Sequence, residues 1–319
     1  MQYNPRRTSD QSGDMMATKS KTVKVRIPAT TANCGPGFDS LGIACDIYNI
    51  LELTLYSENY LHIEISGEGT EYIPTDDKNL VWKVIKDLID ITDAPYKGAY
   101  IKMHNAIPLS RGLGSSAAAI AGGLSAANYA LNEPLDKNGL LKLATSIEGH
   151  PDNVAPAIFG GITISFKDAD DIRTFSFLPK LALKMIVTVP QFFLSTKKSR
   201  KVLPEKVTLK DAAFNISHVA ALTAALCTGN AAVLSYAFAD KLHQPYRACL
   251  IPGMCEVFTA ARQAGALGAA ISGAGPSLIA FATENEDLIG QAMVQAFAEH
   301  NVDSYYMALN IDNTGVCLI

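Results

Sequence analysis

The most informative stretch of this sequence runs Pro108-Leu109-Ser110-Arg111-Gly112-Leu113-Gly114-Ser115-Ser116-Ala117-Ala118. A strand-like segment, residues 99–107, precedes it, and an alanine-rich segment typical of a helix, residues 115–131, follows it. The first turn of a helix has four unpaired N–H groups and the positive end of the helix dipole. Glycines let the backbone approach a phosphate closely, and a serine offers both a helix cap and an oxygen ligand for magnesium. The stretch therefore predicts a polyphosphate-binding loop.

The same stretch has three other interpretations. A bare Gly-x-Gly followed by serine is often only a turn with a helix cap. Gly112, Gly114 and Ala117 match the dinucleotide fingerprint G-x-G-x-x-A, but that fingerprint needs a strand running directly into its first glycine, and residues 108–111 intervene. The fingerprint also expects an acidic residue at the end of the next strand. Glu133 lies at about the right distance along the chain, but it is part of an Asn-Glu-Pro turn. The stretch also lacks the lysine and the spacing of an ordinary P-loop.

The composition narrows the class of protein. The length of 319 residues predicts two domains, and the hydrophobic content of 48% is enough for a large core. A net charge of -4 and a pI near 5.9 argue against binding to nucleic acid. Six cysteines without zinc-ligand spacing indicate reduced thiols and a cytoplasmic location.

Two segments bear on targeting and membrane insertion. Residues 1–20 have no apolar stretch, which excludes a secretory signal, and we expect residues 1–21 to be a disordered tail. Residues 212–239 form the most apolar long segment, but polar residues interrupt it. It therefore predicts buried alanine-rich helices and no membrane contact.

Strands and helices alternate along the chain in a pattern typical of an α+β protein. In the first half we expect strands at 23–27, 50–56, 61–66 and 99–107, helices at 79–91, 115–131 and 137–148, and a hairpin of 161–166 with 172–177. In the second half we expect strands at 183–189, 269–272, 277–282 and from 303, with helices at 209–238, 254–263 and 286–300. The order predicts an N-terminal mixed sheet with helices, residues 22–178, and a C-terminal ferredoxin-like layer, residues 179–319.

Three segments in order resemble the GHMP kinase superfamily. They are residues 108–118, the loop Pro28-Ala29-Thr30-Thr31-Ala32-Asn33 and the turn Ile271-Ser272-Gly273-Ala274-Gly275-Pro276-Ser277. Residues 32–39, 148–157, 195–200 and 243–247 are similar to the branch of this superfamily that phosphorylates homoserine. The resemblance covers the chain from about Lys21 onward. It implies the two-domain GHMP kinase fold, an N-terminal ATP-binding domain, and transfer of the γ-phosphoryl group of ATP to the side-chain hydroxyl of L-homoserine in threonine biosynthesis.

The resemblance also implies roles for individual residues. It places the ATP phosphates on residues 108–118 and Mg²⁺ on Ser116 and Glu148. It places the substrate on Asn33, Asp39, His150, Thr196, Arg200 and Arg247. The planar fork of arginine suits the substrate carboxylate, and Asp39 suits its ammonium group. Without the resemblance, each of these residues has an ordinary structural interpretation. Either arginine would more often be part of a surface salt bridge. Glu148 would be an exposed acid at a helix end, and His150 would be a structural histidine before a proline.

Asn153 stands where several relatives in the superfamily carry an aspartate as catalytic base. A neutral amide cannot accept a proton, so the expected mechanism is positioning and electrostatic stabilisation, with Asp152 as the alternative base. Residues 79–83 either lie beside the adenine or form an ordinary helix start capped by Asn79. Two other functions are open: another GHMP small-molecule kinase, or a nucleotide-binding regulator without catalysis. The resemblance suggests a homodimer.

Overall fold

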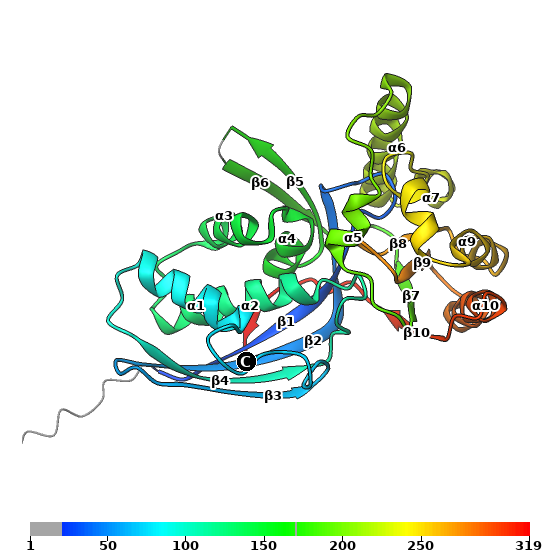
Figure 1. Ribbon diagram of the computed structural model, residues 1–319. Helices are drawn as coiled ribbons and strands as arrows, with labels where there is room; N and C mark the ends of the chain where they lie inside the picture. The colour runs from blue at the N-terminus through cyan, green and yellow to red at the C-terminus, as the bar shows by residue number, and fades with distance from the viewer. Residues whose placement is uncertain (1–20, 170) are drawn as a thin grey trace, which may run out of the picture.

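The computed structural model describes residues 21–169 and 171–319, so the prediction for residues 1–20 lies outside the described residues. Figure 1 shows two sheets, each with its own helices. The larger sheet contains β1 (Val23–Ala32), β2 (Leu41–Tyr56), β3 (Leu61–Gly67), β4 (Gly98–Asn105), β5 (Ile162–Asp168), β6 (Asp171–Phe177) and β11 (Cys317–Leu318). The strand order is β11-β1-β2-β4-β3, and β5 pairs with β2 and β6. Strands β3 and β4 are parallel and the other pairs are antiparallel, which makes this sheet mixed.

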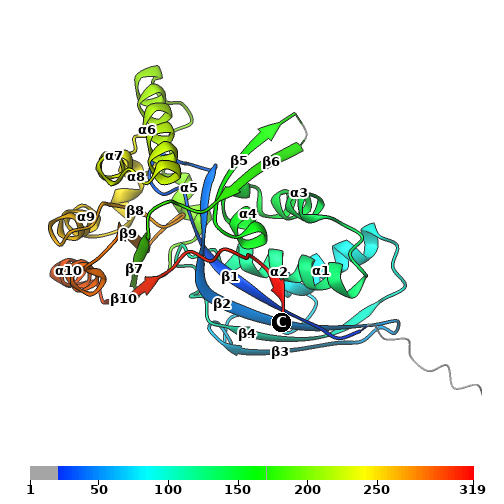
Figure 2. The ribbon, with the colours of Figure 1, turned by 180° about the vertical axis from the view of Figure 1, so that it is seen from behind.

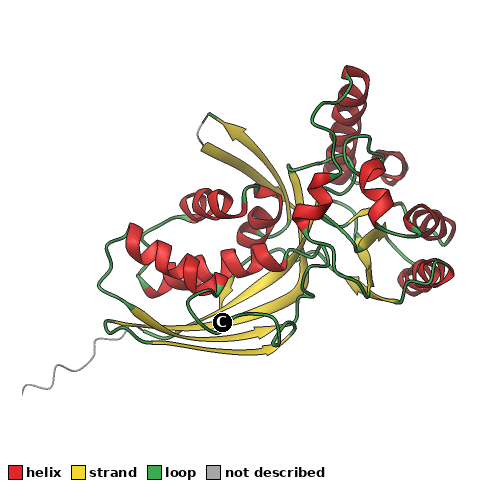
Figure 3. Ribbon diagram, in the orientation of Figure 1, coloured by secondary structure: helices red, strands yellow, loops and turns green. Residues whose placement is uncertain are grey.

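Four helices pack on one face of this sheet (Figure 3). They are α1 (Leu80–Ile91), α2 (Ser115–Ala130), α3 (Lys137–Glu148) and α4 (Pro151–Phe159). Helix α2 is almost completely buried, because small side chains such as Ala117, Ala121 and Gly122 let it lie close to β1 and α1. A side chain on Gly122 would collide with Ile27 of β1 at 2.8 Å. The start of α2 is therefore held in a fixed place against the sheet.

The second sheet has the strand order β10-β7-β9-β8. Its strands are β7 (Lys184–Pro190), β8 (Gly268–Ile271), β9 (Leu278–Ala282) and β10 (Ser304–Leu309), and all neighbours are antiparallel. Its helices are α5 (Thr196–Lys201), α6 (Leu209–Thr228), α7 (Ala231–Ala237), α8 (Gln244–Arg247), α9 (Met254–Gln263) and α10 (Glu286–Glu299). This is the split βαβ order that the sequence predicted, and the α+β class is confirmed.

The last residues of the chain return to the first sheet, as Figure 2 shows from behind. Ile311 forms a bridge with Cys45, and β11 pairs with β1. The predicted boundary near residue 178 lies between β6 and β7, whereas β11 belongs to the larger sheet. The assignment of 22–178 and 179–319 as separate domains stays a prediction.

Several elements differ from the sequence prediction. Pro28–Ala32 was predicted as a loop but continues β1, because the pairing with β2 resumes after an irregularity between Pro28 and Ala29. Helices α4 and α5 and strand β11 were not predicted. Residues 212–239 form helices as predicted, but they are only partly buried: Leu222 and Leu226 are buried, whereas Ile216 is 67% exposed and Tyr236 is 81% exposed. Among residues 21–169 and 171–319, no helix has the length and apolar character needed to cross a membrane.

Candidate active site

One cavity lies where the two sheets meet and collects most of the predicted site residues. The predicted residues that line it are Asn33, Leu109, Ser110, Arg111, Gly112, Gly114, Ser115, Ser116, Glu148, His150, Asn153, Thr196, Arg200 and Arg247. They come from both halves of the chain, and Gly273, Ala274 and Gly275 of the β8–β9 turn join them. A site of this kind forms only when the two sheets are in contact.

Gly112 and Gly114 fix the loop between the two sheets. Gly114 has a left-handed backbone, with φ of 68°, and precedes α2. A side chain there would lie 1.9 Å from the Thr30 hydroxyl oxygen. Gly112 has φ of 75°, and a side chain there would lie 2.2 Å from the carbonyl oxygen of Ser272. The Ser272 hydroxyl also donates to the carbonyl oxygen of Gly112 at 2.6 Å. Both positions therefore require glycine, because Thr30 of the larger sheet leaves no room for a side chain at Gly114 and Ser272 leaves none at Gly112.

The start of α2 is arranged to bind an anion. No side chain among the described residues caps it by a hydrogen bond, and both Ser115 and Ser116 line the cavity. Unpaired N–H groups and the helix dipole favour negative charge at this point.

The remaining residues of the predicted loop lie deeper. Pro108, Leu113, Ala117 and Ala118 are buried and do not line this cavity. Arg111 lines it but is only 8% exposed. Its guanidinium carbon lies 4.1 Å from the centre of the Phe193 ring, and burial lowers its pKa. Phosphate contacts by these five residues, and by the other residues of the loop, stay a prediction.

Ser116 and Glu148 lie side by side at the cavity. The Ser116 hydroxyl donates to Glu148 Oε2 at 2.9 Å. Burial raises the pKa of Glu148, and the hydrogen bond from Ser116 opposes that shift. Hydroxyl and carboxylate oxygens are the donors that Mg²⁺ prefers, and these two converge beside the predicted phosphate loop. The pair therefore fits the predicted metal.

Asn153 and Asp152 occupy the first turn of α4, and both line the cavity. Asn153 Oδ1 accepts a hydrogen bond of 2.9 Å from the Thr30 hydroxyl. The Asp152 carboxylate is buried, and its Oδ1 lies 2.5 Å from His150 Nδ1. Burial lowers the pKa of His150, but the hydrogen bond and the charge of Asp152 outweigh burial and raise it. Asp152 is therefore already paired, and Asn153 has a fixed amide orientation.

Asp39 and Arg200 bind each other. The guanidinium donates to both carboxylate oxygens, at 2.6 and 3.1 Å. Burial lowers the pKa of Arg200, and the hydrogen bond and charge of Asp39 overcome it and raise the pKa. Asp39, His150 and Asp152 also bring one ligand atom each to within 4.8 Å of one another. The arrangement pairs one carboxylate with Arg200 and the other with His150.

Asn33, Thr196 and Arg247 reach the cavity from three different elements. The Asn33 amide donates to the carbonyl oxygen of Gly273 at 2.8 Å and accepts from the backbone N–H of Asp39. Thr196 is the first residue of α5. Arg247, at the end of α8, is 1% exposed and also donates to the carbonyl oxygen of Gly273. Asn33 and Arg247 therefore both attach to the β8–β9 turn.

A second group of lining residues was not singled out by sequence reasoning. Asn49, Met103 and Asn105 of the larger sheet line the cavity beside Asn79 and Leu80. Asn79 also caps α1 through the backbone N–H groups of residues 81 and 82, as the alternative of an ordinary helix start predicted. A place beside the adenine stays a prediction. Sequence reasoning also did not assign a role to Thr30, although this residue lies inside a quoted segment. Its role follows from its hydrogen bond to Asn153, which is distant in sequence.

Comparison with known proteins follows the same division of the chain. Residues 79–161 match the model of the GHMP kinases N terminal domain, and residues 221–299 match that of the GHMP kinases C terminal domain. Both halves thus have the domains of a GHMP kinase.

The similar proteins narrow the class. Homoserine kinase of Moorella thermoacetica is 46% identical over 297 residues, covering 92% of this chain and 99% of that protein. Homoserine kinase of Carboxydothermus hydrogenoformans is 44% identical over 282 residues, covering 88% and 92%. The crystal structure of homoserine kinase from Cytophaga hutchinsonii matches with a TM-score of 0.84 and 31% identity, covering 93% and 97%. The chain belongs to the homoserine kinase family.

Proposed function

We propose that this protein transfers the γ-phosphoryl group of ATP to the side-chain hydroxyl of L-homoserine, which gives O-phospho-L-homoserine for threonine biosynthesis. The observation that supports it most is one cavity that joins an anion-binding helix start, the Ser116–Glu148 pair and buried Arg247. Phosphoryl transfer depends mainly on positioning and on stabilising charge, and these residues supply both.

ATP would bind along the loop at the start of α2. Its phosphates would accept hydrogen bonds from the backbone N–H groups of residues 112–116, and its adenine would lie toward Asn79 and Asn49. Ser116 and Glu148 would hold Mg²⁺, which neutralises charge on the phosphate oxygens when it is bound. The glycine turn at residues 273–275 would cover the loop from the second sheet.

Homoserine would bind on the side of the cavity opposite the adenine. Its carboxylate would pair with Arg247, since Arg200 is already held by Asp39. The acids Asp39 and Asp152 would attract its ammonium group, with Asn33, Thr196 and His150 as further polar partners. Asn153 would donate from Nδ2 to the hydroxyl oxygen, because Oδ1 accepts from Thr30.

The transfer itself needs no strong base in this arrangement. The homoserine hydroxyl oxygen forms a bond to the γ-phosphorus, the bond from that phosphorus to the ADP oxygen breaks, and the hydroxyl proton leaves to water or a phosphate oxygen. Asp152 is a weaker candidate for base than its position suggests, because His150 Nδ1 already contacts it at 2.5 Å. Absence of an ideally placed base costs about 10²–10⁴ in rate, which positioning has to offset.

A substrate panel tests the proposal. ADP release and ³¹P NMR of the product should show phosphorylation of L-homoserine and none of mevalonate or galactose. Phosphorylation of mevalonate or galactose in place of homoserine would indicate another GHMP small-molecule kinase. Tight ATP binding without ADP release from any acceptor would indicate a non-catalytic regulator.

We also propose a homodimer and a cytoplasmic location. Leu209 and Ile216 on α6 and Tyr236 on α7 are exposed apolar side chains, which a second copy would cover. All six cysteines are free, which suits a reducing compartment. Sedimentation of the protein as a monomer at micromolar concentration, or its recovery outside the cytoplasmic fraction, would contradict these two proposals.

A further inference from the structure

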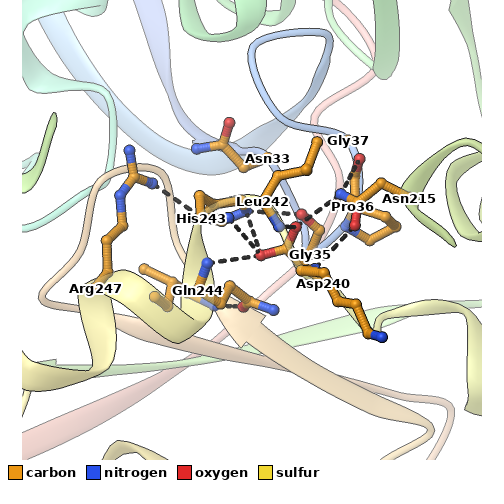
Figure 4. A network of polar contacts seen from close by, with 12 residues as sticks. Asn33, Gly35, Pro36, Gly37, Asn215, Asp240, Leu242, His243, Gln244 and Arg247 are labelled. Carbon is orange, nitrogen blue, oxygen red and sulfur yellow. Dashed lines mark hydrogen bonds and ion pairs between the residues drawn. The ribbon is translucent and has the colours of Figure 1, made fainter. Parts of the chain in front are cut away.

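A buried polar network connects residues 240–247 with Gly35 and Asn215 and ends at Arg247, which lines the cavity (Figure 4). Asp240 lies at the centre of this network, and its side chain is fully buried. Asp240 Oδ2 accepts hydrogen bonds from the backbone N–H groups of His243 at 3.0 Å and Gln244 at 2.6 Å. Its Oδ1 accepts from the Asn215 amide at 2.7 Å and from the backbone of Leu242 at 2.9 Å. These bonds fix the start of α8 and with it the place of the His243 ring.

The two ring nitrogens of His243 have different partners, and these determine its tautomer. Nε2 lies 2.7 Å from the carbonyl oxygen of Gly35, which can only accept, so Nε2 carries the hydrogen. Nδ1 lies 3.1 Å from Arg247 Nη1, which can only donate, so Nδ1 is an acceptor. The imidazole is therefore neutral and buried, and the Phe38 ring stacks on it at 5.2 Å.

Arg247 is the residue that this network orients. Its Nη1 donates to His243 Nδ1 and to the carbonyl oxygen of Gly273, both at 3.1 Å. Its Nε has no hydrogen-bond partner within residues 21–169 and 171–319, although it is buried. Fixing Nη1 leaves the Nε and Nη2 edge of the guanidinium for a carboxylate, which binds such an edge with two parallel hydrogen bonds. The Arg247 side chain lines the cavity, which places the guanidinium beside a bound substrate.

We propose that His243 is a positioning residue for substrate binding: it holds the Arg247 guanidinium in place for the substrate carboxylate, and Gly35 and Asp240 hold His243. This inference rests on the proposed function, because it takes homoserine as the source of the carboxylate. His243 touches no reacting atom, and its effect reaches the substrate only through Arg247.

Two amide substitutions separate the two nitrogens of the ring. In His243→Asn the amide takes the place of Nδ1, so an oxygen can still accept from Arg247, and the bond to Gly35 is lost. In His243→Gln the amide takes the place of Nε2, so the bond to Gly35 is kept and the acceptor for Arg247 is lost. We expect His243→Gln to raise the KM for homoserine by about 10-fold or more, the effect of losing one hydrogen bond to a charged group. His243→Asn should raise it less than His243→Gln does, because the acceptor for Arg247 is kept, and neither variant should change the KM for ATP.

A double-mutant cycle distinguishes positioning from a general structural role. In an Arg247→Leu background, His243→Gln should add almost nothing to the KM for homoserine, since the residue it positions is gone. Additive effects, equal effects of the two His243 variants, or a parallel rise in the KM for ATP would overturn the inference. Should His243→Gln not fold at the assay temperature, Asp240→Asn gives the same test: an unchanged KM for homoserine would overturn the inference.

The outcome for the wild-type protein separates this inference from the proposed function. If the wild-type protein releases no ADP with homoserine, the proposed function fails and the identity of the carboxylate with it. If the wild-type protein is active and His243→Gln binds homoserine normally, only the positioning role of His243 fails.

Discussion

Removal of the Thr30 hydroxyl should lower the turnover rate, although this hydroxyl contacts neither substrate in the proposed arrangement. Thr30 is completely buried on β1, and its hydroxyl donates to Asn153 Oδ1 at 2.9 Å. Replacement by valine keeps the shape of the side chain and removes the donor. Asn153 Oδ1 then loses its partner, and the amide is held only by the longer hydrogen bond of 3.4 Å from Nδ2 to Asp152 Oδ1. We therefore expect its nitrogen to be less well aligned with the homoserine hydroxyl.

The size of the effect follows from the burial of the acceptor. Asn153 is 9% exposed, so its oxygen cannot recover the lost hydrogen bond fully from water. A buried acceptor without a partner costs about 1–3 kcal/mol. If that cost appears in the transition state, kcat falls about 5- to 150-fold in Thr30→Val. The KM for ATP should stay within about twofold, because the backbone N–H of Thr30 still bonds to the carbonyl oxygen of Leu113.

Steady-state kinetics of Thr30→Val and Thr30→Ser provide the assay. Serine keeps the hydroxyl, so Thr30→Ser should retain kcat within about threefold of the wild type. Thermal unfolding of both variants checks that the fold is intact at the assay temperature. A kcat for Thr30→Val equal to that of Thr30→Ser would refute the reasoning, because it would show that the orientation of Asn153 does not limit the rate.

Three further predictions concern the loop, the metal and the buried histidine. Gly149→Ala should lower the free energy of unfolding by roughly 1–2 kcal/mol, the cost of a left-handed backbone alone, because open space surrounds Gly149. Gly112→Ala should lower it by more, because the new side chain would also lie 2.2 Å from a carbonyl oxygen. Chemical denaturation of the two variants compares them, and equal losses would contradict the packing argument. Glu148→Gln should lower kcat about 100-fold or more and raise the Mg²⁺ concentration needed for half-maximal activity, and EDTA should abolish wild-type activity reversibly. An unchanged Mg²⁺ titration would remove Glu148 from the metal site. Burial lowers the pKa of His243 against the opposing charge of Asp240, and the charge of Arg247 adds to the lowering, so the unfolded chain binds the extra proton. The free energy of unfolding of the wild type should therefore fall relative to His243→Asn as the pH drops below about 6.5, and parallel pH curves would contradict this.

Strong local signals made much of the fold predictable. Helix α3 matches its predicted bounds, Lys137–Glu148, because Asp136 caps its start and Gly149 ends it. The strand, loop and helix around residues 99–131 were also predicted, since glycine, proline and alanine each restrict the backbone in a known way. The predicted ferredoxin-like layer follows from the alternation of strands and helices after residue 183.

Other features depend on contacts that no short segment reveals. Pro28–Ala32 has the composition of a loop, yet pairing with β2 makes it strand. The helical pattern of residues 212–239 could not show that Ile216 and Tyr236 face outward, because periodicity gives the faces of a helix and not what covers them.

The candidate site was predictable as a set of residues and much less as a set of bonds. Glu148 was expected beside Ser116, and the two are 2.9 Å apart. Asp39 and Arg200 were each assigned to the substrate, but they bind each other across 161 positions of sequence. Thr30 is 123 positions from its partner Asn153. A single sequence holds no record of which distant polar groups meet, so pairing of this kind appears only in the fold.

The central claim is that backbone N–H groups at the start of α2 hold the phosphates of ATP beside a magnesium ion. A crystal structure of the protein with Mg²⁺, homoserine and a non-hydrolysable ATP analogue measures this directly. Phosphate oxygens should lie within about 3.2 Å of backbone nitrogens in residues 112–116, with the metal bound by Ser116 and Glu148. Phosphates bound away from this loop, or a metal held by other residues, would contradict the account.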